Sequence, residues 1–351
     1  MPDSTQHFEP NATELDSARA LMARHLVWDN HGCMPVARPH DTSFLPQLQR
    51  YRESGVNAVT LNIGFGDQGV EDHLRTIASF RRWLLDRPDQ YLLLSKPEDL
   101  TVARATGRLA VGFDIEGSNA IGDQISLLET YQKLGVRWML LAYNIGNRVG
   151  GGCQQEDAGL TSFGRDVVRE MERLGLWVCL SHTGHRTARD VLAMAQRPVI
   201  FSHSNPSALR PHPRNIPDEL IRACAQTGGV VGINGFGAFL GNNVATPELY
   251  ARHVDHVVQL VGPSHVSLAL DHVFDVDEMN AGLAAMAHMF PPELGYQTPV
   301  AMLEPEQLTE VVAILQSWGY DEDSLALLMG GNLLRLLFNG NEHRRNDEYK
   351  A

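Results

Sequence analysis

The chain has 351 residues, of which 29 are basic and 42 acidic, and its formal net charge is −13 at pH 7. This acidic balance argues against nucleic acid and anionic membranes as partners, because both attract basic patches. Hydrophobic residues make up 43% of the chain and charged residues 20%, which is typical of a soluble globular protein, and no apolar run is long enough to cross a bilayer. Small molecules are therefore the expected partners.

The N-terminus and the cysteines both indicate a reducing compartment. The opening residues are polar and acidic and lack the basic and apolar stretches of a secretory signal, so a cytoplasmic location is expected. Cys33, Cys153, Cys179 and Cys224 show no CxxC pairing, which indicates free thiols rather than a disulfide framework. Cys179 and Cys224 are expected in the core.

Short apolar runs alternate with amphipathic segments along most of the chain. After a first helix over Thr13–Arg24, strands are predicted at His25–Asn30, Ala58–Ile63, Leu109–Ile115, Trp138–Ala142, Leu176–Leu180, Pro198–Phe201, Gly229–Ile233 and Val266–Leu270. Helices are predicted between them at Leu45–Glu53, Asp72–Leu85, Ile125–Leu134, Phe163–Leu174, Arg186–Ala195 and Asp218–Gln226. This alternation predicts one α/β domain, a (β/α)8 TIM-type barrel whose site lies at the C-terminal ends of the strands.

The chain continues beyond the last predicted strand. The segment Phe274–Glu304 has no clear period and is expected to form a lid or an interface. Helices are predicted over Pro305–Trp318 and Ser324–Phe338, and the charged tail Asn339–Ala351 is expected to fray.

Two neighbouring strands end in the same dipeptide, Ser-His. The crossover helix between them requires the strands to run parallel, so His182 and His203 follow strand ends at one rim. Adjacent strands lie roughly 4.8 Å apart, which allows both imidazoles to reach one metal ion. In the alternative interpretation each histidine only ends its strand and bonds to a loop, but the repetition favours a metal site.

Other strands also end in side chains that bind metals or substrates. The full set of such residues is His31, Cys33, Glu116, Tyr143, His182, His203 and Asp271. Neutral imidazoles suit zinc, a carboxylate can bridge two ions, and paired metals activate a shared water while they polarise a carbonyl. The pattern predicts a hydrolytic metal site.

At these residues the sequence resembles the membrane (renal) dipeptidase family of the metal-dependent amidohydrolase superfamily. The resemblance extends over almost the whole chain. It is carried by IEG at 115–117, GLTSFG at 159–164, VVREMERLG at 167–175, LSH at 180–182, SHSN at 202–205, HPRN at 212–215, GGVVGIN at 228–234 and GGNLLRLL at 330–337.

The resemblance implies a barrel that binds zinc, as two ions rather than one, and a small substrate that carries a carboxylate. Glu116 would bridge the ions, His182 and His203 would bind one, and His31 the other. Arg214 would hold the C-terminal carboxylate of the substrate, for which a guanidinium fork is suited. Asp271 would pass a proton from the bridging water to the departing amine. The resemblance also implies a homodimer.

Cys33 departs from the family pattern, in which the first strand ends in HxD. A thiolate binds zinc at about 2.3 Å, and the metal would itself lower the pKa of the thiol. Three outcomes remain open: Cys33 ligates zinc, the first metal position is weak or empty, or the site selects another metal. Cys33 as a non-ligating small apolar residue is the competing interpretation.

Tyr143 is the second departure, because the family has a histidine there that donates to the scissile carbonyl. A phenol can also donate a hydrogen bond, but Tyr143 could equally be only a pocket wall. His272, next to Asp271, is expected to be structurally neutral. The histidines expected outside the site, on the surface or bonded in loops, are His185, His212, His253, His256 and His265.

We therefore expect a zinc-dependent hydrolase of an amide bond in a dipeptide or dipeptide-like molecule. Because Cys33 and Tyr143 both lie where the scissile group would bind, activity on generic dipeptides such as Ala-Ala is expected to be weak, and a specialised amide or N-acylated small acid is the expected substrate. An alternative is an altered family member that binds a small carboxylate ligand without hydrolysis. A third possibility is isomerisation or redox chemistry through Cys33.

Overall fold

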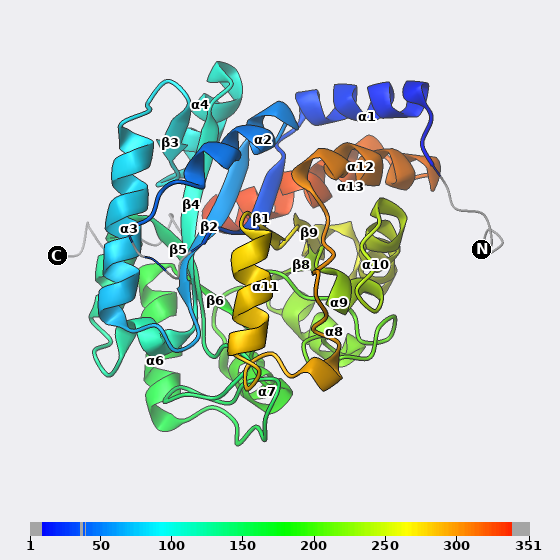
Figure 1. Cartoon of the computed structure of the whole chain (residues 1–351). Helices are drawn as coiled ribbons and strands as arrows, with labels where there is room; N and C mark the ends of the chain where they lie inside the picture. Colours follow the sequence, from blue (N-terminus) through cyan, green and yellow to red (C-terminus); the bar gives the residue numbers. More distant parts are fainter. Residues whose placement is uncertain (1–8, 36–37, 39, 339–351) are drawn as a thin grey trace.

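The computed structural model describes residues 9–35, 38 and 40–338. Its strands form one parallel sheet in the order β10-β1-β2-β4-β5-β6-β7-β8-β9, with β3 paired to β4 at the side. β9 (Val266–Ala269) pairs with β8, and β10 (His272–Val273) pairs with β1, so the two halves of this last strand close the sheet into a barrel. This confirms the predicted (β/α)8 architecture (Figure 1).

All eight predicted strands are present within a few residues of their expected bounds. Besides β9 and β10, the strands are β1 (Trp28–Cys33), β2 (Ala58–Phe65), β3 (Tyr91–Leu93), β4 (Leu109–Glu116), β5 (Val136–Leu140), β6 (Trp177–Cys179), β7 (Ile200–Phe201) and β8 (Val230–Asn234). β3 was not predicted, because its three residues pair only along the edge of β4.

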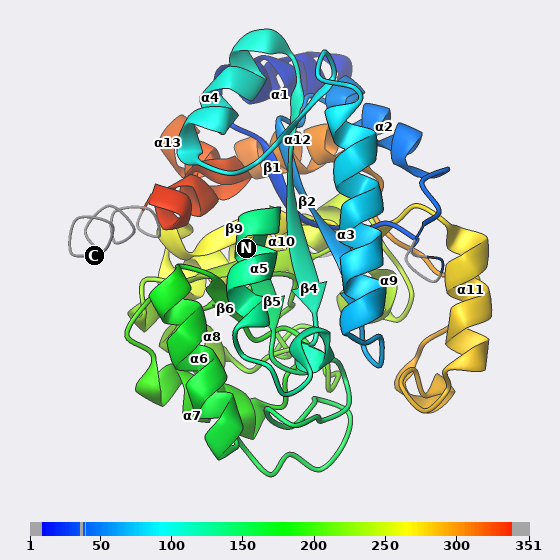
Figure 2. The ribbon, with the colours of Figure 1, turned by 90° about the vertical axis from the view of Figure 1, so that its left-hand side faces the viewer.

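Helices surround the barrel, as Figures 1 and 2 show. The larger ones are α1 (Ala12–Arg24), α2 (Leu48–Glu53), α3 (Val70–Leu85), α4 (Pro97–Thr106), α5 (Leu127–Leu134), α6 (Ser162–Leu174), α7 (His185–Met194), α8 (Asp218–Gln226), α9 (Gly237–Gly241), α10 (Pro247–Val261), α11 (Val276–Ala285), α12 (Leu308–Ser317) and α13 (Glu322–Ala326). Four of them, α4, α9, α10 and α11, were not predicted from the sequence.

The C-terminal half corrects one expectation and confirms another. The segment Phe274–Glu304 is not irregular throughout, because Asp275 caps the first turn of α11. The helix predicted over Ser324–Phe338 contains a π-helical turn at Leu327–Gly331 and continues as a helix through residues 332–338. The tail Asn339–Ala351 lies outside the described residues. None of the described helices combines the length and the apolar character needed to span a membrane.

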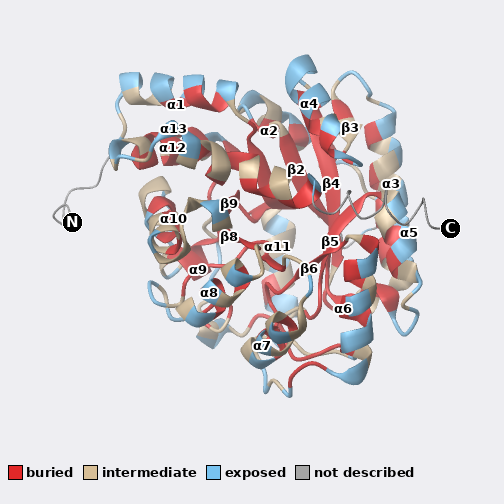
Figure 3. Ribbon diagram, turned by 180° about the vertical axis from the view of Figure 1, so that it is seen from behind, coloured by how far each residue is buried: buried red, intermediate tan, exposed pale blue. Residues whose placement is uncertain are grey.

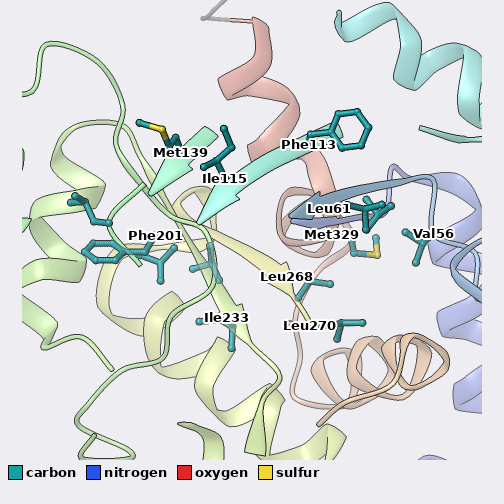
Figure 4. Close-up of a cluster of buried hydrophobic side chains, with 14 of the residues drawn as sticks. Val56, Leu61, Phe113, Ile115, Met139, Phe201, Ile233, Leu268, Leu270 and Met329 are labelled. Carbon is teal, nitrogen blue, oxygen red and sulfur yellow. The ribbon is translucent and has the colours of Figure 1, made fainter. Parts of the chain in front are cut away.

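The described residues form three buried hydrophobic clusters, of which the two larger lie on opposite faces of the strands and the third lies around Phe236, Phe239 and Phe290. Ala58 and Trp138 belong to one cluster and their neighbours Val59 and Met139 to the other, as the alternation of strand side chains requires. Figure 4 shows part of the largest cluster, packed between strands and helices, and in Figure 3 the strands are buried while the helices expose their outer faces.

The second of these clusters, which contains Ala58 and Trp138, fills the inside of the barrel. Trp28 of β1 and Trp177 of β6 approach to 6.2 Å between ring centroids although their strands are not neighbours, so the contact crosses the interior. Leu333 and Leu336 close one end of this cluster. At the other end the Trp138 ring lies 5.5 Å from the His31 ring, so the apolar interior reaches the predicted site.

Candidate metal centre

Three imidazoles converge on one carboxylate at the C-terminal ends of the strands. Glu116 is the last residue of β4, and His182 and His203 follow β6 and β7. The Glu116 Oε1 atom lies 3.2 Å from Nε2 of His203, 3.5 Å from Nε2 of His31 and 3.6 Å from Nε2 of His182. The two Nε2 atoms of His182 and His203 are 3.0 Å apart. These strand ends therefore meet, as the parallel topology predicted.

Cys33 and Asp271 form a second group that shares His31 with the first. The Cys33 thiol donates to Asp271 Oδ1 over 3.2 Å and lies 3.2 Å from His31 Nε2. His31, Cys33 and Asp271 together have one ligand atom each within 4.8 Å of one another, as do His31, Glu116 and His203. The donor atoms thus fall into two overlapping sets joined at His31.

The outward-facing nitrogen of each imidazole is held by a polar partner. Nδ1 of His31 lies 3.2 Å from Asp114 Oδ2, and Nδ1 of His182 lies 2.7 Å from Asn144 Oδ1. Because the Asn144 oxygen can only accept, Nδ1 of His182 carries the proton and its Nε2 lone pair faces Glu116, and an ionised Asp114 likewise accepts from Nδ1 of His31. Nδ1 of His203 bonds the Ser202 hydroxyl at 2.7 Å. Such outer partners are typical of metal-binding histidines.

The electrostatics of this cluster fit a bound cation. Burial raises the pKa of Glu116 to about 8, with Asp114 and Asp271 adding to the shift. Burial also holds the pKa of His182 and of His203 well below the usual value, so both imidazoles are neutral. Neutral imidazoles beside a buried carboxylate are the ligands that a divalent metal such as zinc prefers, and a cation would offset the cost of burying the acid.

Two site residues sit in left-handed backbone conformations. φ is 59° at His182 and 54° at Asp271, a region that non-glycine residues rarely adopt. Asp271 follows β9, its amide donates to the His31 carbonyl, and its Oδ2 accepts from Asn234 over 2.8 Å. The turn interrupts the strand between β9 and β10 and presents the carboxylate at the rim. Such outliers cluster at functional sites.

Tyr143 lies against the cluster of candidate metal ligands. Its ring stacks on His182 with centroids 4.1 Å apart, and it lines the cavity above the site. Burial holds the pKa of Tyr143 well above the usual value, so the phenol keeps its proton and remains a donor. Tyr143 is therefore placed to contact a ligand and is also part of the pocket wall.

Arg214 is buried beside the cluster, with 1% of its surface exposed. Its guanidinium donates to Ser204 Oγ over 3.1 Å and to the His203 carbonyl over 2.7 Å. Its Nε has no hydrogen-bond partner among the described residues, and Arg214 is not among the residues that line the cavity. Burial by itself would raise the pKa of Asp271, but the hydrogen bond and the charge of His31, followed by the charge of Arg214, together hold that pKa below its usual value.

The histidines expected outside the centre do not belong to the convergent set. His253 is buried and its Nε2 bonds the Leu240 carbonyl, while His272 is buried with its Nε2 3.2 Å from an Arg50 nitrogen. His212 lies closer to the site than expected, because its ring packs 5.0 Å from Phe239 and its Nδ1 accepts from the Arg214 amide.

Several supporting residues were not found from the sequence. Asp114 stands two positions before Glu116 on β4, so the twofold period of a strand puts both on one face and could have revealed it. Asn144 next to Tyr143 and Ser202 next to His203 carry no comparable local signal. Asn62 also supports the site, since its Nδ2 donates to Glu116 Oε2 over 3.3 Å.

A cavity of about 300 Å³ opens above the cluster of candidate metal ligands. Cys33, Glu116, His182 and Asp271 form its polar floor, together with Asn62. The remaining walls come from loops after the strands and from α11, which Figure 2 shows at the margin of the molecule, outside the ring of helices. The fold is a (β/α)8 barrel, and the residues that converge at its C-terminal rim are of the kinds that could hold divalent metal ions.

Comparison with known proteins identifies the family. Residues 15–289 match the model of the membrane dipeptidase family, peptidase family M19. The chain belongs to this family. The predicted resemblance is thereby confirmed.

The relatives agree with this assignment. Dipeptidase aclJ of Aspergillus oryzae is 30% identical over 276 residues, 76% of this chain and 61% of its own length. An uncharacterized dipeptidase of Schizosaccharomyces pombe is 33% identical over 213 residues, 58% of this chain and 51% of its own length. The matched part thus spans only about half to two thirds of these curated relatives.

Among solved structures, an amidohydrolase from Pseudomonas aeruginosa superposes with a TM-score of 0.81 at 26% identity, covering 92% of this chain and 98% of that one. A metallopeptidase from Rhodobacter sphaeroides, solved with a phosphinate mimic of the dipeptide L-Ala-D-Ala, has a TM-score of 0.73 at 20% identity and covers 89% of this chain and 98% of that one. This second likeness concerns the fold alone.

Proposed function

We propose that this protein is a metal-dependent hydrolase that cleaves an amide bond in a dipeptide or a dipeptide-like small molecule. The observation that carries the proposal is the convergence of three imidazole Nε2 atoms on Glu116 Oε1 within 3.6 Å at the floor of a cavity. Membership of the dipeptidase family supports the same reaction class.

The donor set suits zinc, and two ions fit it better than one because the ligand atoms form two overlapping groups. Glu116 would bridge, with His182 and His203 on one side and His31 and Cys33 on the other. Bound divalent ions would lower the pKa of a shared water and polarise the scissile carbonyl. Asp114 and Asn144 would keep the imidazoles in the ligating tautomer.

The remaining residues act on the substrate and its protons. Asp271 would accept a proton at Oδ1 and pass it to the departing amine nitrogen, while Asn234 holds Oδ2. The Tyr143 hydroxyl would donate to the carbonyl oxygen as negative charge develops there. Arg214 does not line the cavity, so it would attract the substrate carboxylate through its buried positive charge beside the cluster.

The direct test measures amide hydrolysis by the purified protein as isolated, after a chelator has removed its metal, and after zinc has been added back. The Asp271→Asn variant is measured in parallel with the wild type. We expect activity that needs metal and falls by roughly 10²–10⁴-fold in the variant, the usual contribution of a general acid–base group. If metal-loaded wild type cleaves no dipeptide or N-acyl amino acid, the proposal is wrong.

The alternative is a family member that binds a small carboxylate without hydrolysis, and Cys33 at the position of a family carboxylate is the feature that favours it. A ligand that binds the metal-loaded protein without turnover would support this alternative. Redox or isomerase chemistry through Cys33 would appear as a product other than the two halves of an amide. A cytoplasmic location and a homodimer are further proposals, which cell fractionation and sedimentation can test.

A further inference from the structure

An unbroken series of aromatic rings forms one side of the cavity. Phe65 contacts Tyr143 at 5.3 Å between centroids, and Tyr143 contacts Phe290 at 6.2 Å. The series continues from Phe290 to Tyr296 at 5.3 Å, then to Phe239 at 5.8 Å and to Phe236 at 5.3 Å. All six rings line the cavity. We call these six residues the aromatic arc.

The helix α11 lines the cavity with apolar groups, one glycine and one acidic side chain, Glu278. Met279, Gly282 and Met286 line the cavity and recur at three- and four-residue spacing, so they share one helix face. Ala281 and Ala284 are exposed on the rest of the helix. Methionine side chains adapt to irregular apolar shapes, and Gly282 leaves room between the two.

The arc and the floor are parts of one cavity. Tyr143 belongs to the arc and stacks on His182, which approaches Glu116 on the floor. A group held among the rings is therefore next to any amide that lies over the metal ligands. Protein interiors are normally packed without such voids, and a cavity of roughly 150 Å³ is enough to hold benzene. The cavity here is about twice that volume.

We propose that the substrate carries a large apolar group, of the size of a benzyl side chain or larger, directly beside the scissile amide, and that the aromatic arc and α11 select for it. This inference rests on the proposed amide hydrolysis and names the substrate class of the same site. The apolar group is either a side chain of a dipeptide or the acyl group of an N-acyl amino acid, since both offer the same surface to the rings.

The experiment compares kcat/KM for Ala-Ala, Phe-Ala, Ala-Phe and N-phenylacetyl-alanine in the metal-loaded protein. We expect at least one aromatic substrate to exceed Ala-Ala by tenfold or more, since each buried methylene in such a pocket contributes about tenfold. The preferred aromatic substrate identifies the source of the apolar group. Ala-Ala turned over as well as all three would overturn the inference.

Gly282→Leu tests the cavity itself. Gly282 has ordinary helical φ, and an added Cβ would meet only the flexible Met286 tip at 3.3 Å, so the helix should fold and gain helix propensity. We expect the preferred aromatic substrate to lose tenfold or more in kcat/KM while Ala-Ala changes less than threefold. The matched control, Ala284→Leu on the exposed face, should keep the wild-type ratio.

Equal ratios in Gly282→Leu and wild type would contradict the inference while leaving hydrolysis intact. If no amide is cleaved at all, the proposed function fails, and binding still tests the cavity. In that case calorimetry with phosphinate dipeptide mimics that carry methyl or benzyl groups replaces kinetics. The inference is supported if the benzyl mimic binds the wild type more tightly than the methyl mimic and this difference disappears in Gly282→Leu. Equal binding of the benzyl and methyl mimics to the wild type would contradict it.

Discussion

The floor of the cavity and the aromatic arc above it are built in different ways. The floor side chains come from strand ends, and partners such as Asp114 and Asn234 hold them by directed hydrogen bonds. The arc comes mostly from segments between the strands, with Phe65 at the end of β2 and Phe239 in α9, and its rings contact one another through ring packing, which has no strict geometry. The sheet therefore positions the side chains that could carry the chemistry, whereas the segments between the strands shape what can approach them. Substitutions should therefore abolish function in the floor and shift preference in the arc.

The sharpest test of this comparison is Glu116→Gln. It removes the charge on which three imidazoles converge, so we expect loss of bound metal and a fall in kcat/KM of roughly 10³-fold. Metal analysis and kinetics measure both. Glu129→Gln, at an exposed glutamate paired with Lys133, is the matched control and should change neither. Full metal content in Glu116→Gln would show that the floor does not depend on this carboxylate.

Cys33→Ala tests the least expected member of the floor. If the thiol is a ligand, the variant should lose about one ion per chain, whereas Cys33→Asp should retain it because a carboxylate can replace the thiolate. Metal content by mass spectrometry measures both. Unchanged stoichiometry in Cys33→Ala would exclude Cys33 as a necessary ligand and leave it as part of the cavity wall.

Asp114→Asn keeps the size of a supporting residue and removes its charge. The amide accepts more weakly from His31 Nδ1, so metal affinity or activity should fall by roughly 10–100-fold, less than for Glu116. Competition with a chelator measures the affinity. A variant with wild-type affinity would mean that the floor histidines need no outer support.

The smallest effect is expected behind the arc, at His212. Burial lowers its pKa to about 4 from the usual 6.5, so the unfolded chain binds the additional proton between these values. The contribution of His212 to the free energy of unfolding is therefore fully present above pH 6.5 and is lost as the pH falls toward 4. His212→Phe should flatten the slope of the unfolding free energy by no more than about 1.4 kcal/mol per pH unit, as denaturant titrations can measure. Equal slopes would contradict this.

Much of the floor could be predicted because its residues follow strands. His182 and His203 were found from two apolar runs that end alike, and the structure places their Nε2 atoms 3.0 Å apart. Asp114 was missed although its spacing from Glu116 contained the signal. The arc could not be predicted, since Phe236, Phe290 and Tyr296 lie in segments without period and meet only after folding.

The alternation of strands and helices, the family and the side chains at the strand ends could all be read from the amino-acid sequence. Parallel strands in a barrel bring their C-terminal residues to one rim, and this does not depend on the conformation of the loops. Only the tertiary structure decided that β10 closes the barrel beside β1, that α11 covers the site, and that six rings line one cavity. Those features depend on contacts between segments far apart in the chain, and such contacts leave no local pattern in the residues that make them.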